Sequence, residues 1–92
     1  MKFTLNHSRA LSGNDISVAL EAEGEESIQR VETKLDGFSL GADVLEDSSD
    51  SYQRVFSGVG DAGPGTDHTL VVSVEQGDGK THSATCMWTD PV

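Results

Sequence analysis

Residues Ser27–Gly41, SIQRVETKLDGFSLG, decide the fold because they fit two kinds of secondary structure. Ile28, Val31 and Leu35 have the i, i+3, i+7 spacing of a short amphipathic helix. The dipeptide Asp36-Gly37 is instead typical of the tight turn of a β-hairpin. A helix here would give a mixed α and β domain, whereas a hairpin would make the whole chain a β protein.

A helix over this stretch lacks the usual signals of a helix start. Ser27 has Arg30 three residues later, where a capping box needs Glu or Gln. The β-branched residues of the stretch also lower its helix propensity. A strand fits better, because apolar or β-branched residues alternate with charged ones up to Leu35, and a bulge near Gln29-Arg30 brings Ile28 into phase. We therefore predict a hairpin, and its turn accounts for the aspartate at position 36.

The rest of the chain shows the same alternation. Glycine occurs ten times and stands mostly between short apolar runs, as in proteins built from strands and turns. The clearest run is DISVALEAEG, in which every second residue from Ile16 to Ala22 is apolar. We predict a turn at residues 12–15 and loops at 42–51 and 59–67. About seven strands in one domain, residues 1–92, predict an all-β antiparallel sandwich of two sheets.

The charge of the chain restricts its partners. Sixteen acidic residues against six basic ones give a net charge of −10, which disfavours nucleic acid and anionic membranes because phosphate contacts need Lys or Arg. One explanation is solubility, including a surface adapted to salt or acid. The other is a basic partner protein, or mimicry of the charge of nucleic acid. Four carboxylates lie close together and form the candidate docking surface: Glu21, Glu23, Glu25 and Glu26.

The single cysteine and the N-terminal segment bear on the compartment. Cys86 has no partner for an internal disulfide, so the chain is compatible with a reducing cytoplasm. On the last strand, Cys86 and Trp88 are predicted to face the core. The first residues lack a continuous apolar segment, and no run approaches the roughly 18 apolar residues of a membrane span. We expect a soluble protein, cytoplasmic by default, and export by a signal-independent route stays open.

The order of these motifs resembles bacterial immunoglobulin-like (Ig-like) domains. Their pattern I-x-x-V-x-x-x-x-D-G-x-x-L-G is similar to Ile28–Gly41, and an aromatic strand, SYQRVFSG, and a Gly/Pro loop follow. The family's G-x-x-H/Y-T-L-x-V-x-V strand and D-G turn are similar to His68–Val74 and Asp78-Gly79. The resemblance spans roughly residues 15–90 and implies an Ig-like Greek-key sandwich of bacterial or phage origin. Family members are usually tandem modules of surface proteins, and this chain has no recognisable export signal.

Catalytic and metal-binding motifs are weak in this sequence. His7, His68 and His82 have no zinc-ligand spacing, and no G-x-S-x-G motif accompanies the many Ser and Asp residues, so no enzyme is predicted. Calcium is the alternative ligand, because loop carboxylates at one end of a sandwich suit it. The candidate ligands are Glu46, Asp47 and Asp50.

The sequence therefore predicts a non-catalytic protein–protein interaction module without a cofactor, such as an adaptor, a particle component or an inhibitor. An exposed edge strand or the acidic face would contact the partner, which would be another protein of basic character. The alternative is a calcium-stabilised structural module. The oligomeric state is left open by the sequence.

Overall fold

A computed structural model of the chain describes residues 1–11, 13–24, 26–60, 63 and 65–90, and the backbone alone at Ser48. The described residues form seven strands: β1 (Lys2–Ala10), β2 (Gly13–Glu21), β3 (Ile28–Leu35), β4 (Phe38–Ser49), β5 (Ser51–Val59), β6 (Asp67–Gln76) and β7 (Thr81–Thr89). The prediction of about seven strands is confirmed. No helix in the described part is long and apolar enough to cross a membrane.

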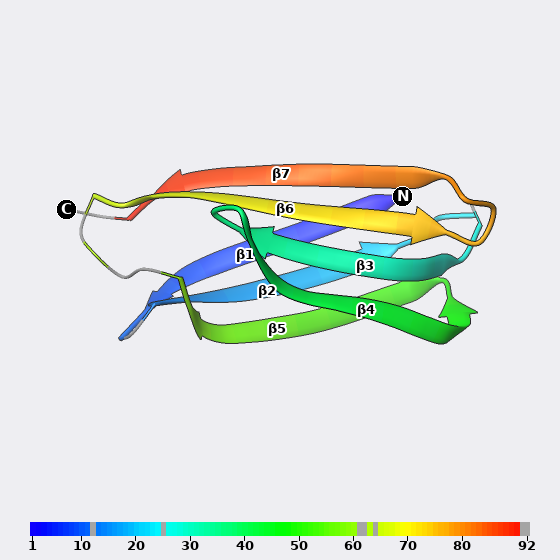
Figure 1. Cartoon of the computed structure of the whole chain (residues 1–92), viewed down its shortest axis with the longest axis horizontal. Helices are drawn as coiled ribbons and strands as arrows, with labels where there is room; N and C mark the ends of the chain where they lie inside the picture. Colours follow the sequence, from blue (N-terminus) through cyan, green and yellow to red (C-terminus); the bar gives the residue numbers. More distant parts are fainter. Residues whose placement is uncertain (12, 25, 61–62, 64, 91–92) are drawn as a thin grey trace.

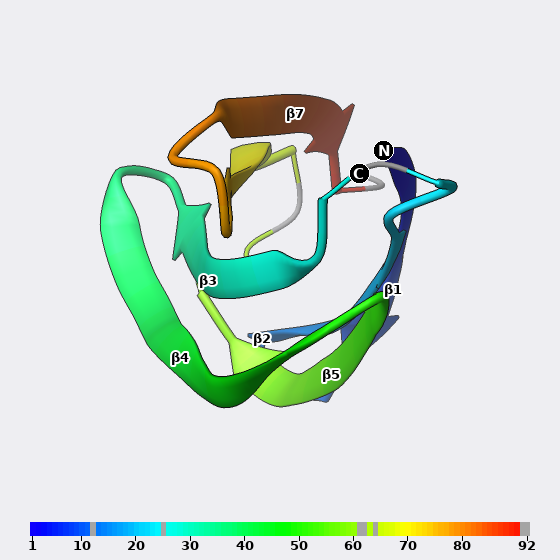
Figure 2. The ribbon, with the colours of Figure 1, turned by 90° about the vertical axis from the view of Figure 1, so that its right-hand side faces the viewer.

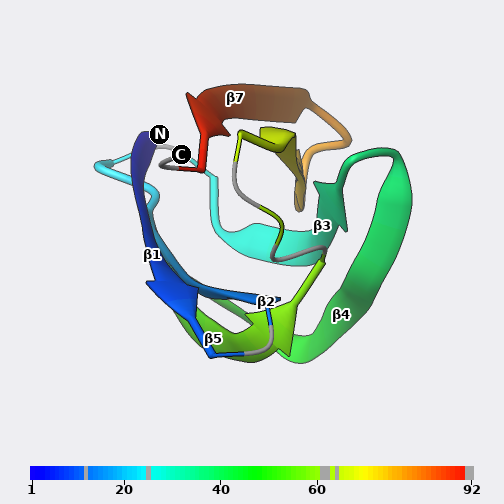
Figure 3. The same ribbon diagram turned by 90° about the vertical axis from the view of Figure 1, so that its left-hand side faces the viewer.

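The strands pair into two antiparallel sheets that face each other (Figure 1). One sheet has the order β1-β2-β5 and the other the order β4-β3-β6-β7. The end-on views in Figures 2 and 3 show β4 beside β5 along one edge of the molecule, and β1 near β7 at the other. At that second edge the His7 ring stacks on the Trp88 ring with 4.0 Å between their centroids. The predicted two-sheet sandwich is therefore correct.

The core lies between the sheets and is built by alternate residues of the inner strands. Ile16, Val18 and Leu20 of β2 face Leu70, Val72 and Val74 of β6, and all six side chains are almost fully buried. Ile28, Val31 and Leu35 of β3 and Phe56 of β5 complete the buried cluster. On β7, alternate residues from His82 to Trp88 are half-buried, so the predicted inward orientation of Cys86 and Trp88 is confirmed.

The stretch Ser27–Gly41 forms a hairpin between β3 and β4, as predicted. Leu35 pairs with Phe38 across the two-residue turn, and Asp36 and Gly37 have φ angles of +52° and +85°. Positive φ at both central residues is the geometry of a type I′ turn, which matches the twist of the strands it joins. The register shifts between Ile28 and Arg30 against both neighbouring strands, where the bulge was expected.

Two loop predictions need correction. The acidic segment 42–51 is not a loop, because β4 continues to Ser49 and β5 starts at Ser51. Its polar residues are compatible with a strand because β4 lies at the edge of its sheet, where side chains reach water. The turn at 12–15 is also displaced, since β2 already begins at Gly13. The predicted loop 59–67 joins β5 to β6, with residues 61, 62 and 64 outside the described chain.

Candidate functional site

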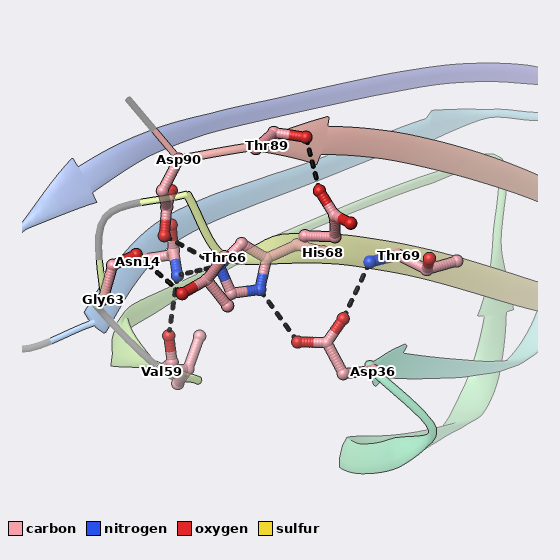
Figure 4. A network of polar contacts seen from close by, with 10 residues as sticks. Asn14, Asp36, Val59, Gly63, Thr66, His68, Thr69, Thr89 and Asp90 are labelled. Atoms are coloured by element: carbon pink, nitrogen blue, oxygen red, sulfur yellow. Dashed lines mark hydrogen bonds and ion pairs between the residues drawn. The ribbon is translucent and has the colours of Figure 1, made fainter. Parts of the chain in front are cut away.

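A buried polar cluster surrounds His68 at the end of the sandwich that holds the β3–β4 turn (Figure 4). The Nδ1 atom of His68 lies 2.8 Å from Oδ2 of Asp36, and its Nε2 atom lies 2.8 Å from Oδ2 of Asp90. His68 is 1% exposed and Asp90 is 2% exposed. Nδ2 of Asn14 lies 3.5 Å from Nε2 of the same ring, and it donates a hydrogen bond to the carbonyl of Val59. Strand β2, the β3–β4 turn and the C-terminal segment therefore meet at the imidazole of His68 on β6.

The two carboxylates determine the protonation of this ring. When both carboxylates are ionised they can only accept hydrogen bonds, so both ring nitrogens of His68 then donate and the ring is an imidazolium. Burial acts to lower the pKa of His68, but the hydrogen bonds and charges of Asp36 and Asp90 outweigh it and leave the pKa above its ordinary value. One positive charge is thus held between two negative ones.

This cluster ties the hairpin turn and the C-terminal segment to the core. The second oxygen of the Asp36 carboxylate accepts a hydrogen bond from the backbone N–H of Thr69 at 2.8 Å, so Asp36 holds the start of β6 as well as its own turn. A histidine whose ring nitrogens both donate has no lone pair with which to act as a general base. The geometry is that of a structural clamp.

The clamp predicts a particular pH dependence of stability. The pKa of His68 is raised in the folded chain, so its stabilisation is fully present below the unfolded pKa of about 6.5 and is lost as pH rises through the folded pKa. We expect the free energy of unfolding to fall over that range in the wild type and not in His68→Gln, whose side chain does not titrate. Urea unfolding at a series of pH values measures the difference between the two proteins. If the free energy of unfolding changed equally with pH in the two proteins, His68 would not carry a charge in the folded chain.

A second polar cluster joins the two sheets along the edge formed by β4 and β5. Oδ2 of Asp43 accepts hydrogen bonds from the hydroxyl of Tyr52 and from Nη1 of Arg54, the latter at 2.8 Å. The guanidinium of Arg54 also lies over the Phe56 ring, 4.5 Å from its centroid. Because β4 and β5 belong to different sheets, these contacts stabilise the edge without any backbone pairing.

The pKa values in this second cluster are shifted in the directions that its contacts require. The hydrogen bonds from Tyr52 and Arg54 lower the pKa of Asp43. Burial and the neighbouring carboxylate raise the pKa of Tyr52 to about 12. Asp43 is therefore ionised and Tyr52 is neutral near pH 7.

The structure places the predicted docking carboxylates at the opposite end of the sandwich from His68. Glu21 ends β2, and Glu23 and Glu26 lie in the connection to β3, all three exposed; Glu25 lies outside the described residues. Backbone hydrogen bonds bring neighbouring segments to the same end, from Ala22 N to Asp50 O and from Gly77 N to Ser27 O.

The carboxylates considered for calcium lie at this end too. Glu46 and Asp47 are exposed residues near the end of β4, and Asp50 lies in its connection to β5, with its side chain accepting a hydrogen bond from Ser27. Within the described residues, no group of three or more His, Cys, Asp or Glu side chains is arranged to hold a metal ion. Calcium binding by Glu46, Asp47 and Asp50 stays a prediction. We name as the acidic end the exposed residues Glu21, Glu23, Glu26, Glu46, Asp47, Asp50 and Asp78.

Comparison with known proteins does not assign a family to this geometry. The chain matches no protein-family model, no curated protein and no solved structure. The site must therefore be judged from its own chemistry.

The clamp is not evident from the sequence. The predicted turn accounts for Asp36 and is present, but the carboxylate also binds a residue 32 positions away. The available signal was weak: His68 is a titratable residue at the start of an otherwise apolar run and would point to the core by alternation. The sequence does not indicate that Asp90 would meet it.

Proposed function

We propose that this chain is a non-catalytic Ig-like domain that binds a basic protein through its acidic end. The strand order supports the Ig-like assignment: β1, β2 and β5 correspond to strands A, B and E, and β3, β6 and β7 to strands C, F and G. On this assignment β4 lies beside strand C, as C′ does in variable-type Ig domains.

The observation that carries the binding proposal is the gathering of carboxylates from separate segments at one end of the molecule. The described carboxylates of the acidic end come from β2, the β2–β3 connection, β4, the β4–β5 connection and the β6–β7 turn. Two lysines lie nearby, Lys2 at the start of β1 and Lys80 in the β6–β7 turn. The carboxylates of the acidic end outnumber them, so negative charge dominates there. A concentrated charge of one sign speeds the encounter with a partner of the opposite sign and orients it.

Among the described residues, fewer carboxylates lie at the opposite end, and each of them has a partner within the fold. Asp36 and Asp90 bind His68, Asp15 accepts a hydrogen bond from Gly58 N, and Asp67 accepts one from Thr89. Carboxylates already engaged within the fold contribute less to an intermolecular contact. Asp50 and Asp78 of the acidic end are engaged in this way by Ser27 and Lys80, so the comparison rests on the other five carboxylates of that end. The acidic end is thus the better docking surface of the two.

A pair of charge-matched variants tests this proposal. E21Q/E23Q/E26Q removes three charges from the acidic end, and D15N/E32Q/D67N removes three elsewhere. Proteins retained from a lysate of the native host by the wild type should bind the first variant about tenfold more weakly, and raised salt should release them. The second variant should bind like the wild type. The same partners held equally by both variants, or binding indifferent to salt, would exclude electrostatic docking at this end.

A further inference from the structure

Two turns of the sandwich contain the dipeptide Asp-Gly, the sequence in which aspartate isomerises most readily. They are Asp36-Gly37 between β3 and β4, and Asp78-Gly79 between β6 and β7. Glycine has no side chain to shield its backbone nitrogen, so this nitrogen can attack the carboxyl group of the aspartate that precedes it. The two turns therefore have the same local chemistry, and only their surroundings can make them react at different rates.

The isomerisation needs no enzyme, cofactor or oxidant. The glycine nitrogen forms a bond to Cγ of the protonated aspartate carboxyl and loses its proton, and one carboxyl oxygen leaves as water. Water then opens the resulting succinimide ring at either of its two carbonyl carbons. One opening restores aspartate, and the other gives isoaspartate, in which the main chain runs through the former side chain. Because water is lost and then regained, the composition and formal charge of the chain do not change.

The carboxylate of Asp36 is restrained by strand β6. Its Oδ1 accepts a hydrogen bond from the N–H of Thr69 at 2.8 Å, and its Oδ2 lies 2.8 Å from Nδ1 of the buried His68. The backbone N–H of Asp36 also donates to the carbonyl of Thr69 at 2.9 Å. Figure 4 shows the carboxylate directed at these two residues. They lie 32 and 33 positions away in the chain, so releasing the carboxylate requires the turn to separate from β6.

The contacts of Asp78 lie within its own turn. Its Oδ1 accepts a hydrogen bond from the N–H of Lys80 at 3.0 Å, and its Oδ2 lies 3.9 Å from the ammonium group of the same residue. The N–H of Gly79 donates to the carbonyl of Gln76 at 2.9 Å. A fluctuation of this one turn can break all three contacts without separating any strands. Exposure does not distinguish the two sites, because the side chain is 32% exposed for Asp36 and 31% exposed for Asp78.

We propose that Asp78 is a site of spontaneous isomerisation to isoaspartate, and that the clamp around His68 protects Asp36 from the same reaction. The reacting carboxyl must first leave its contacts and rotate onto the glycine nitrogen, so the easier local opening reacts faster. Isomerisation at Asp36 would lengthen the main chain of its turn and displace the carboxylate that binds His68. The inference concerns the chemistry of the chain alone and does not depend on binding at the acidic end.

Prolonged incubation of the full chain at physiological temperature and pH tests the proposal. Mass spectrometry that distinguishes isoaspartate from aspartate in peptides should find isoaspartate forming at least about tenfold faster at position 78 than at position 36. In guanidinium chloride, which removes both sets of contacts, the two rates should become similar. The proposal would be overturned by equal rates in the folded chain, by no isoaspartate at position 78, or by a difference that persists in denaturant.

Two variants separate the clamp from general stability. His68→Gln removes the cation that holds Oδ2 of Asp36, so isoaspartate at position 36 should form several-fold faster. Val72→Ala truncates a fully buried side chain and leaves the contacts of Asp36 in place, so position 36 should stay slow. Position 78 is the internal reference in both variants, and circular dichroism checks their folding. A rate at position 36 that is unchanged in His68→Gln, or raised equally in Val72→Ala, would show that the clamp does not protect Asp36.

Discussion

His68→Ala is expected to lower the free energy of unfolding by about 3–5 kcal/mol, because it removes the buried cation between Asp36 and Asp90. The carboxylate of Asp90, which is 2% exposed, would be left without its positive partner in a site that water does not reach. A small domain has a total stability near the low end of about 5–15 kcal/mol, so this one change would remove a large share of it. Urea unfolding followed by tryptophan fluorescence measures the loss.

His82→Ala is the matched control for that substitution. His82 is a half-buried histidine on β7, and its Nε2 lies 2.9 Å from Oε1 of Gln76, an uncharged partner. Removing the ring takes this partner from the buried carbonyl oxygen of Gln76, which typically costs about 1–3 kcal/mol and less than leaving a buried charge unpaired. If the two alanine variants lost the same stability, the ion cluster around His68 would not be a principal support of the fold. If His68→Ala proves too unstable to purify, the milder His68→Gln keeps the comparison measurable.

Leu35→Ala and Phe38→Ala are expected to differ strongly although the two residues pair across the same turn. Leu35 is 2% exposed, and truncating a buried leucine costs about 2–5 kcal/mol through lost burial and the cavity that remains. Phe38 is 77% exposed, and its truncation should change stability by no more than about 0.5 kcal/mol. Thermal and urea unfolding of both variants measure the contrast.

The same two variants also test the register of the β3–β4 hairpin. A slip of one residue in the register of either strand would exchange its buried and exposed positions, because side chains alternate across a sheet. Equal losses in the two variants would therefore contradict the observed register. A large loss in Phe38→Ala alone would mean that the aromatic ring, and not the leucine, enters the core.

Local sequence was sufficient for the strands and their buried faces. The alternation from Ile16 to Ala22 predicted the inward residues of β2, since a period of two follows directly from strand geometry. The Asp36-Gly37 turn and the bulge after Ile28 could also be predicted, because positive φ angles and a change of phase are properties of a few adjacent residues.

The local sequence does not show whether a strand lies at the centre or at the edge of its sheet. The segment 42–51 was predicted as a loop because it is acidic, and the structure extends β4 through most of it. A run of acidic residues is tolerated better in an edge strand than in a central one, and only the pairing order shows which strands are edges. The position of β7 at an edge likewise follows only from the pairing order.

What the sequence by itself determined is therefore the set of strands, the turn that joins β3 to β4, and the negative charge. The tertiary structure alone decided that Asp36 and Asp90, which lie 32 and 22 positions from His68, bind the same ring. It also brought separate acidic segments to one end and left β7 at an edge. The physical reason is that strand formation depends on neighbours along the chain, whereas ion pairs, surfaces and edges depend on contacts between segments far apart in it.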